Sequence, residues 1–328
     1  MGKISILGTG SWGSAIGESL AQNGHDVTLW QRDFQKAKKM QDLRKHIFID
    51  NFTFSDNINF TSNLESALNN VDIIVVAVPS HSVRELISQA NKFINDSIVI
   101  VNIAKGLEID SLLTMSAVIC EETDGVSIVS LYGPSHAEEV VKKIPTTLVA
   151  ASTDENARKM VQKIFSSSVL RVYTNNDILG IELGGSLKNV IAIAAGICDG
   201  IGFGDNTKAA ILTRGIAEMT RLGVAMGALE KTFAGLSGIG DLFVTCSSKY
   251  SRNRFVGEEI GRGKKLDEIL SEMKMVAEGV KTAKAVHQLC QKHIVEMPIS
   301  LAVYNVLYNN KDPRESVKEL MSRDLVSE

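Results

Sequence analysis

Three glycines, Gly8, Gly10 and Gly13, separate a short apolar segment from a segment with helical periodicity near the start of the 328-residue chain. Glycine loses more backbone freedom on folding than any other residue, so this cluster needs a physical reason. The spacing GxGxxG between a strand and a helix allows a tight turn, brings bare backbone against a pyrophosphate and packs the helix on the strand. The motif therefore predicts the first βαβ unit of a dinucleotide-binding domain.

The first half of the chain alternates between strand and helix patterns. The segment VDIIVVAV is a continuous apolar run of the kind found in a parallel strand buried on both faces. The patterns predict strands at 3–7, 26–30, 71–78, 97–103, 126–131 and 146–151, and helices at 14–23, 34–43, 82–93 and 111–121. Strands that alternate with helices favour a doubly wound parallel sheet, so we predict an α/β, Rossmann-like N-terminal domain.

The second half changes character and reads as helical throughout. Its periodicity predicts helices at 178–196, 208–226, 251–262, 266–273, 279–293, 300–309 and 313–321. We therefore predict a dinucleotide-binding domain over residues 1–176 and an all-α substrate-binding and catalytic domain over residues 177–328. A cofactor domain joined to a helical domain predicts a site in the cleft between them.

Composition excludes several other classes of function. The chain has 35 Lys and Arg against 38 Asp and Glu, a net charge of −3, so no global positive field attracts nucleic acid or an anionic membrane. The four cysteines form no CxxC pair and the six histidines no HxxxH pair, which argues against a metal site and favours idle thiols in a reducing cytoplasm. Neither a leader nor an apolar run long enough to span a bilayer is apparent.

The residues after the second predicted strand bear on the choice of cofactor. An acidic residue at this point binds the ribose hydroxyls of NAD, whereas an arginine accommodates the 2′-phosphate of NADP. The chain presents Gln31 and Arg32 first and Asp33 only afterwards. We therefore expect NADPH to be favoured over NADH, unless Arg32 is simply a solvated surface charge.

The segment IELGGSLKNVIAIAAG places Lys188 on a strongly apolar helix. Such a lysine either extends to the surface or is desolvated with a lowered pKa, which suits general acid–base catalysis. The segment GLSGIGDLFVTC adds Asp241 and Thr245, which share one face if that segment is helical. Asp241 is then either the partner of the lysine ammonium or a helix cap.

Other candidate residues lie in a basic segment and at two strand ends. The segment SSKYSRNRF offers Lys249, Arg252, Asn253 and Arg254, and Arg262, Lys264 and Lys265 follow it; this is either a phosphate site or a solvated basic face. Lys105 follows a buried strand, and Gly133, Pro134 and Ser135 follow another, where open α/β sheets bind ligands. His136 is a weaker candidate base than Lys188 because no carboxylate obviously orients it.

Taken together, these segments resemble the NAD(P)-dependent glycerol-3-phosphate dehydrogenases of the bacterial type. The resemblance runs through most of the chain, in the expected order, and rests on GTGSWG, VAVPS, AKGLE, YGPSHAEEV, ELGGSLKNVIAIAAG, GLSGIGDLFVTC, SRNR and VAEGV. One departure is the GGSLKN stretch with Gly185 and Ser186, where members of the family commonly have an alanine. Both replacements are small, so we expect the chemistry to be unchanged.

The resemblance implies a role for individual residues. It makes Lys188 the proton acceptor in glycerol 3-phosphate oxidation and the proton donor in the reverse reaction, supported by Asp241, Asn189 and Thr245. It implies substrate contacts for Lys105, Gly133, Ser135, Lys188, Asp241, Ser251, Arg252 and Asn253, with the phosphate held by Arg252 and Asn253. It implies cofactor contacts for Gly8, Gly10, Ser11, Trp12, Gly13, Arg32, Lys105, Ala137, Arg252, Val276 and Glu278.

The implied reaction is the reversible reduction of dihydroxyacetone phosphate to sn-glycerol 3-phosphate with NAD(P)H, which supplies phospholipid synthesis. The resemblance also implies a homodimer. Two alternatives stay open from the residues alone. One is a related lysine-dependent dehydrogenase acting on a β-hydroxy acid or on 6-phosphogluconate, and the other is a non-catalytic sensor of the dinucleotide.

Overall fold

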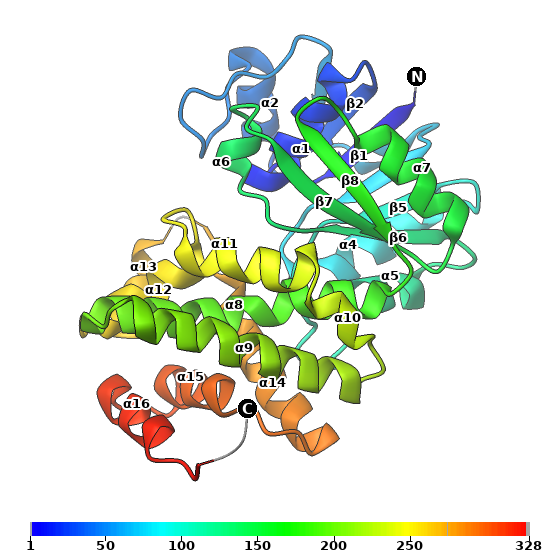
Figure 1. Ribbon diagram of the computed structural model, residues 1–328. Coiled ribbons are helices and arrows are strands. Elements are labelled where there is room, and N and C mark those ends of the chain that lie inside the picture. Colours follow the sequence, from blue (N-terminus) through cyan, green and yellow to red (C-terminus); the bar gives the residue numbers. More distant parts are fainter. Residues whose placement is uncertain (1, 274, 326–328) are drawn as a thin grey trace. The chain divides into compact units, whose positions relative to one another are not determined.

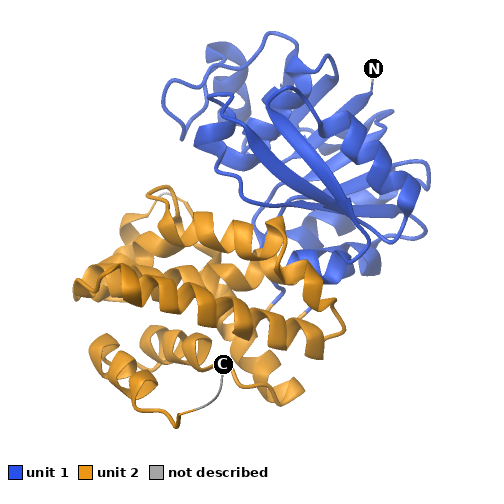
Figure 2. Ribbon diagram, viewed as in Figure 1, with its two compact units in different colours: residues 1–108, 113–182 blue, residues 109–112, 183–328 orange. Residues whose placement is uncertain are grey.

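The computed structural model describes residues 2–273 and 275–325, which divide into two units (Figure 2). Unit 1 takes in residues 2–108 and 113–182, and unit 2 takes in the other described residues, from 109–112 and 183–325. The boundary that we predicted near residue 176 stays a prediction.

One mainly parallel sheet forms the centre of unit 1 (Figure 1). In the described part of the chain the strand order is β3-β2-β1-β4-β5-β6-β7-β8. Its first six positions follow the doubly wound order, whose switch point between β1 and β4 is where dinucleotides bind in such sheets. The strands are β1 (Lys3–Leu7), β2 (Asp26–Trp30), β3 (Ile58–Thr61), β4 (Ile73–Val76), β5 (Val99–Asn102), β6 (Ser127–Tyr132), β7 (Thr146–Ala151) and β8 (Leu170–Asn175).

Helices pack on both faces of this sheet, and the alternation of side chains along the strands assigns each helix to a face. On β4, Ile73 and Val75 belong to the core with α1 and α7, whereas Ile74 and Val76 belong to the core with α4 and α5. The helices of unit 1 are α1 (Ser11–Gln22), α2 (Phe34–Leu43), α3 (Leu64–Leu68), α4 (Val83–Ala90), α5 (Met115–Glu122), α6 (Ala137–Val140) and α7 (Glu155–Phe165), with short turns η1 (Ser80–Ser82) and η2 (Asn91–Phe93).

The predicted fold class of this unit is confirmed, with one difference in strand direction. β7 pairs with β6 in the antiparallel sense and β8 runs parallel to β7, so the last two strands oppose the other six. The connection from β6 to β7 contains only the four-residue α6. An antiparallel neighbour does not need the crossover helix that a parallel one requires.

Unit 2 contains helices and, among its described residues, no strand, which confirms the predicted all-α character. Its helices are α8 (Ile178–Ile201), which begins in unit 1, α9 (Asp205–Ala225), α10 (Glu230–Phe233), the π-helical turn η3 (Leu236–Gly240), α11 (Asp241–Ser247), α12 (Arg252–Gly261), α13 (Leu266–Glu272), α14 (Glu278–His293), α15 (Pro298–Tyr308) and α16 (Pro313–Met321).

α8 is a long and strongly apolar helix. By length and composition alone this helix could cross a membrane, although it contains no uninterrupted apolar run of that length. In the structure, 89% of its most apolar window is buried. Backbones approach closely where α12 crosses it: a Cβ at Gly257 would collide with the carbonyl oxygen of Ile193. This contact brings Arg252 and Asn253, at the start of α12, to the same helix that carries Lys188.

Candidate functional site

The glycine turn after β1 separates into two kinds of position. Gly8 has φ +123° and a Cβ there would lie 2.7 Å from the carbonyl oxygen of Ala77, at the end of β4. A Cβ at Gly13 would lie 2.7 Å from the Cβ of Ala77, so both glycines are required by the packing of β1, β4 and α1. For Gly10, no described atom lies within 4 Å of the Cβ position, and the backbone is extended. The chain's own packing does not require that glycine, and the open space suits a ligand.

The N-terminus of α1 faces the same turn. Gly10 is the N-cap residue, offers no side chain, and no acidic residue stands in the first turn of the helix. The indole Nε1 of Trp12 is buried and has no hydrogen-bond partner within residues 2–273 and 275–325. Helix N-termini bind anions through their free amides and their dipole. The turn therefore fits the pyrophosphate of a dinucleotide.

The three residues after β2 differ in how they are engaged. The Asp33 carboxylate caps α2 by accepting a hydrogen bond from the Lys36 amide at 3.1 Å, and this bond lowers the pKa of Asp33. Gln31 donates to the Thr9 hydroxyl at 2.5 Å. Arg32 is exposed between them. At the end of β2, the Arg32 guanidinium is therefore more available to a ligand than the Asp33 carboxylate is.

Three further predicted residues meet where β5 and β6 end. The Lys105 ammonium donates to the carbonyl oxygen of Gly133 at 3.1 Å, and the Ser135 hydroxyl donates to the same oxygen at 3.0 Å. Gly133 has φ +148°, and its Cβ position lies 2.9 Å from the Thr147 carbonyl oxygen, so this turn also requires glycine. Ala137 begins α6 and is buried in the core of unit 1.

In unit 2, α8 and α11 form a buried polar cluster. The Lys188 ammonium donates to the Asp241 carboxylate and to the Thr245 hydroxyl, both at 2.5 Å, and the hydroxyl donates to the Asp241 carbonyl oxygen at 2.6 Å. Lys188 is 5% exposed and Asp241 1% exposed. The alternative in which Lys188 extends to the surface is therefore wrong. Asp241 and Thr245 share one helix face, as their spacing predicted.

The amides of Asn189 and Asn253 connect three helices. The Asn253 side chain donates to the Asn189 carbonyl oxygen Oδ1 at 2.8 Å, and its own Oδ1 accepts from the Gly279 amide at 2.9 Å. This link between α8, α12 and α14 was not predicted, because the sequence shows no pattern that pairs these residues. It fixes the orientation of the Asn253 amide.

Arg252 and Ser251 stand at the start of α12. The Arg252 guanidinium is exposed and donates to the Val276 carbonyl oxygen at 2.9 Å, just before Glu278 begins α14. Ser251 is buried, and its hydroxyl caps α12 by accepting from the Arg254 amide at 3.2 Å. The structure thus brings together the predicted residues Arg252 and Val276.

The rest of the basic segment is largely paired with carboxylates of unit 2. Arg254 contacts Asp199 at 2.7 Å, and Lys264 contacts Glu259 at 2.7 Å. The hydrogen bond that the Lys264 ammonium donates to Glu259 raises the pKa of Lys264. Arg262 also pairs with Glu259, at 2.6 Å. These ion pairs argue against one phosphate-binding cluster made of all these cations, and Arg252 with Asn253 is the part that stays a candidate for such a site.

Comparison with known proteins assigns the family. The family model described as the NAD-dependent glycerol-3-phosphate dehydrogenase N-terminus matches residues 3–158, and the corresponding C-terminus model matches residues 177–318. The chain belongs to the NAD-dependent glycerol-3-phosphate dehydrogenase family. The recognition drawn from the sequence motifs is confirmed.

Curated relatives and a solved structure match over nearly the whole chain. A protein named glycerol-3-phosphate dehydrogenase (NAD(P)+) from Thermoanaerobacter sp. strain X514 is 49% identical over 98% of this chain and 97% of its own. A protein of the same name from Chlorobium limicola is 48% identical over 98% of each chain. The crystal structure of glycerol-3-phosphate dehydrogenase from Coxiella burnetii has a TM-score of 0.95 and 35% identity, and covers 98% of this chain and 99% of its own.

The family assignment bears on the open alternatives. It goes against the β-hydroxy acid and 6-phosphogluconate dehydrogenases, and it supports an oxidoreductase over a sensor. Among the described residues, no group of three or more His, Cys, Asp or Glu could hold a metal ion. The thiols of Cys198 and Cys246 are free and buried, and burial raises the pKa of Cys246 to about 12.

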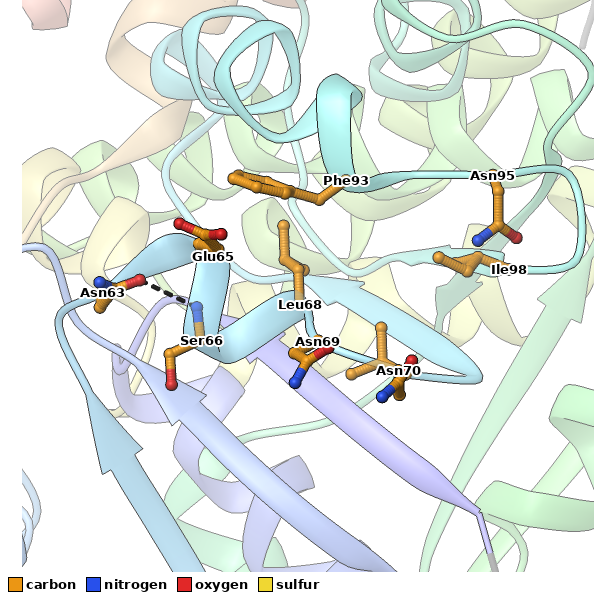
Figure 3. Close-up of a pocket in the computed structure, with 10 residues that line it drawn as sticks. Asn63, Glu65, Ser66, Leu68, Asn69, Asn70, Phe93, Asn95 and Ile98 are labelled. Atoms are coloured by element: carbon orange, nitrogen blue, oxygen red, sulfur yellow. Dashed lines mark hydrogen bonds between the residues drawn. The ribbon is translucent and has the colours of Figure 1, made fainter.

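A surface pocket of about 480 Å³ lies at the amino ends of two strands of the sheet (Figure 3). Asn69, Asn70 and Val71 precede β4 and Ile98 precedes β5, so this pocket is at the amino ends of the strands. Parallel α/β sheets bind ligands at the carboxyl ends. No predicted site residue lines this pocket, which is a groove between α3 and the turn after η2 and not part of the candidate site.

Proposed function

We propose that this chain reduces dihydroxyacetone phosphate to sn-glycerol 3-phosphate with NAD(P)H, reversibly. The observation that carries the proposal is the buried cluster of Lys188, Asp241 and Thr245, in which an ammonium group is held at 2.5 Å from a carboxylate. A buried cation needs such a partner to stay charged. A charged lysine in a desolvated position is the acid that carbonyl reduction requires.

The glycine turn of unit 1 and the residues near it would hold the dinucleotide. The open space at Gly10 and the unpartnered indole of Trp12, within the described chain, support this assignment. When bound, the reduced nicotinamide supplies the hydride that becomes the new C2–H bond of the product. We assign the cofactor to Gly8, Gly10, Ser11, Trp12, Gly13, Arg32, Lys105, Ala137, Arg252, Val276 and Glu278.

We further propose that NADPH is preferred over NADH. Arg32 is exposed after β2, whereas the Asp33 carboxylate is engaged as the cap of α2. A guanidinium binds a phosphate through paired hydrogen bonds, and a capping carboxylate is less able to accept from ribose hydroxyls.

Lys188 would act on the carbonyl oxygen of the substrate. As negative charge develops on that oxygen, the ammonium stabilises it and then transfers a proton from Nζ to give the hydroxyl of the product. An ammonium group has three N–H donors, and Asp241 and Thr245 hold Nζ in one position by each accepting a hydrogen bond from it. In the oxidation direction the neutral amine accepts the proton of the C2 hydroxyl.

The phosphate of the substrate would bind to Arg252 and Asn253. The exposed guanidinium of Arg252 supplies two parallel donors. Asn253 has one N–H beyond the one that it donates to Asn189. Binding of this unreacting phosphate orients the carbonyl group at the lysine. The proposed substrate set also includes Lys105, Gly133, Ser135, Lys188, Asp241 and Ser251. Asn189 supports the lysine.

We also propose a cytoplasmic homodimer that supplies glycerol phosphate to phospholipid synthesis. Free thiols, including the exposed Cys120, support a reducing compartment. The exposed apolar side chains of Leu229, Ile239 and Phe243 in unit 2 support association of two copies. Sedimentation velocity tests the dimer, and a single species with the mass of one chain would refute it.

The function is tested by following the loss of reduced nicotinamide absorbance with dihydroxyacetone phosphate, with NADPH and NADH in parallel. Lys188→Met should lower kcat by about 10²–10⁴-fold while NADPH still binds. The matched control is Lys208→Met, because Lys208 pairs with Asp199 at 2.6 Å elsewhere in unit 2 and should keep most of the activity. No turnover with either cofactor, despite cofactor binding, would refute the proposed reaction.

A further inference from the structure

Glu182 is a buried carboxylate to which the motifs assign no role. It lies in the first turns of α8, within unit 1, and is 0% exposed. It accepts hydrogen bonds from the Ser116 hydroxyl at 2.6 Å, the Ser130 hydroxyl at 2.7 Å and the Asn102 amide at 2.8 Å, and from the Ser116 backbone amide at 3.0 Å. A carboxylate in this position is tolerated only because its oxygens are satisfied. The groups that donate to Glu182 must therefore keep their positions around its carboxylate.

The Asn102 side chain links Glu182 to the backbone of the segment after β5. Its Nδ2 donates to Glu182, and its Oδ1 accepts from the Ala104 amide at 3.0 Å. The hydroxyl of Tyr132, the last residue of β6, donates to the Ala104 carbonyl oxygen and accepts from Asn102 at 3.0 Å. Because Nδ2 must face the carboxylate, Oδ1 must face Ala104. Both backbone groups of Ala104 are held in this way.

Lys105 is the next residue along the chain. Its ammonium donates to the Gly133 carbonyl oxygen at 3.1 Å and lies 5.6 Å from the centre of the Tyr132 ring. The orientation of this side chain depends on the backbone at Ala104, and that backbone depends on Asn102 and Tyr132. All of these contacts lie within unit 1.

We propose that Glu182 is a positioning residue that fixes the Ala104–Lys105 backbone, and with it the Lys105 ammonium, for the reaction. This inference rests on the proposed function, because it assigns Lys105 to substrate and cofactor. Glu182 itself touches neither of them in this account. It acts by fixing the direction of the Asn102 amide.

The test is a double-mutant cycle between Glu182 and Lys105. Glu182→Met removes the acceptor and should lower kcat/KM for dihydroxyacetone phosphate by about 10–100-fold, since small displacements of a positioned group are costly. Glu182→Gln keeps one carbonyl oxygen for Asn102 and Ser130 and should restore most of the activity. In a Lys105→Ala background, Glu182→Met should cause little further loss, because the group that it positions is already absent.

The matched control is Glu218→Met. Glu218 is 3% exposed in α9 and accepts from the Ile299 amide at 2.7 Å and the Ser300 amide at 3.1 Å, at the start of α15 in unit 2. It bonds to none of the proposed site residues in these contacts. Its loss should affect stability without the dependence on Lys105. If Glu182→Met does not fold, Tyr132→Phe removes the bond to the Ala104 carbonyl oxygen and should show the same dependence.

A second readout is independent of activity. Amide hydrogen exchange at Ala104 should be faster in Glu182→Met than in the wild type and unchanged in Glu218→Met, because the Ala104 amide loses its fixed acceptor. Losses that multiply in the Lys105→Ala background, or unchanged exchange at Ala104, would overturn the inference. If the wild type does not reduce dihydroxyacetone phosphate, the proposed function fails, and the exchange measurement still decides whether Glu182 holds this segment.

Discussion

Replacement of either partner of the Lys188–Asp241 pair should destabilise unit 2 strongly. The two groups lie 2.5 Å apart and are 5% and 1% exposed, so neither can be solvated by water when its partner is lost. Breaking a buried pair by removing one member costs about 3–5 kcal/mol, because the remaining charge loses its oppositely charged partner. Lys188→Met and Asp241→Leu should each lower the free energy of unfolding by about that amount, although the Thr245 hydroxyl offsets part of it for the lysine.

The double variant Lys188→Met/Asp241→Leu should recover this loss. With both charges gone, the site is apolar and of similar volume, and such replacements are neutral or stabilising by about 1–4 kcal/mol. Activity should not recover with stability. All three variants should lose kcat by at least about 10²-fold if the ammonium is the acid of the reaction. The pair would then be retained for catalysis at the expense of stability.

The measurement is urea unfolding followed by far-ultraviolet circular dichroism. Trp12 and Trp30 are the two tryptophans of the chain and both lie in unit 1, so tryptophan fluorescence reports on that unit and the helical signal is needed for unit 2. The two probes together separate the units. Single variants as stable as the wild type, or a double variant that shows the sum of the single losses, would refute the reasoning.

Three further predictions concern the ligand contacts. Gly13→Ala should destabilise the protein by about 1–3 kcal/mol through overpacking against Ala77, whereas Gly10→Ala should leave the urea midpoint nearly unchanged and weaken NADPH binding in a fluorescence titration. Equal effects of the two on stability would contradict this account of the turn. Arg32→Ala should raise KM for NADPH and leave KM for NADH nearly unchanged in steady-state assays, and equal changes would exclude a role at the 2′-phosphate. Arg252→Lys should raise KM for dihydroxyacetone phosphate by about 10–100-fold, since an ammonium cannot replace the paired donors of a guanidinium; an unchanged KM would remove this residue from the phosphate site.

The central strands could be predicted because burial on both faces leaves a continuous apolar run. All four residues of β4 are buried, and its position within the predicted 71–78 run is confirmed. The edge strands β3 and β8 were missed. β8 alternates buried and exposed residues through Leu170, Arg171, Val172 and Tyr173, a weaker signal in a short segment. Strand direction leaves no trace in periodicity, so the reversal at β7 could not be predicted.

The candidate site was predictable to the extent that its contacts are local. Asp241 and Thr245 are four residues apart, and a helix brings such residues together. The candidate pairing of Asp241 with the Lys188 ammonium is confirmed, although the two residues lie 53 positions apart and no spacing rule connects them. Glu182 shows the limit: its partners Asn102, Ser116 and Ser130 lie 80, 66 and 52 residues from it, and no spacing rule connects them. Only the fold of the sheet brings them to one carboxylate.

The glycine motif shows how packing and function can be separated within one short turn. At Gly8 and Gly13, atoms of the chain itself exclude a side chain, so any protein with this backbone would need glycine there, with or without a ligand. At Gly10, the described chain leaves the Cβ position open and the backbone conformation is one that any residue can adopt. The packing of the chain therefore does not explain the glycine at this position, whereas close approach of a ligand does. Gly10 is the glycine of the three that argues for a bound dinucleotide.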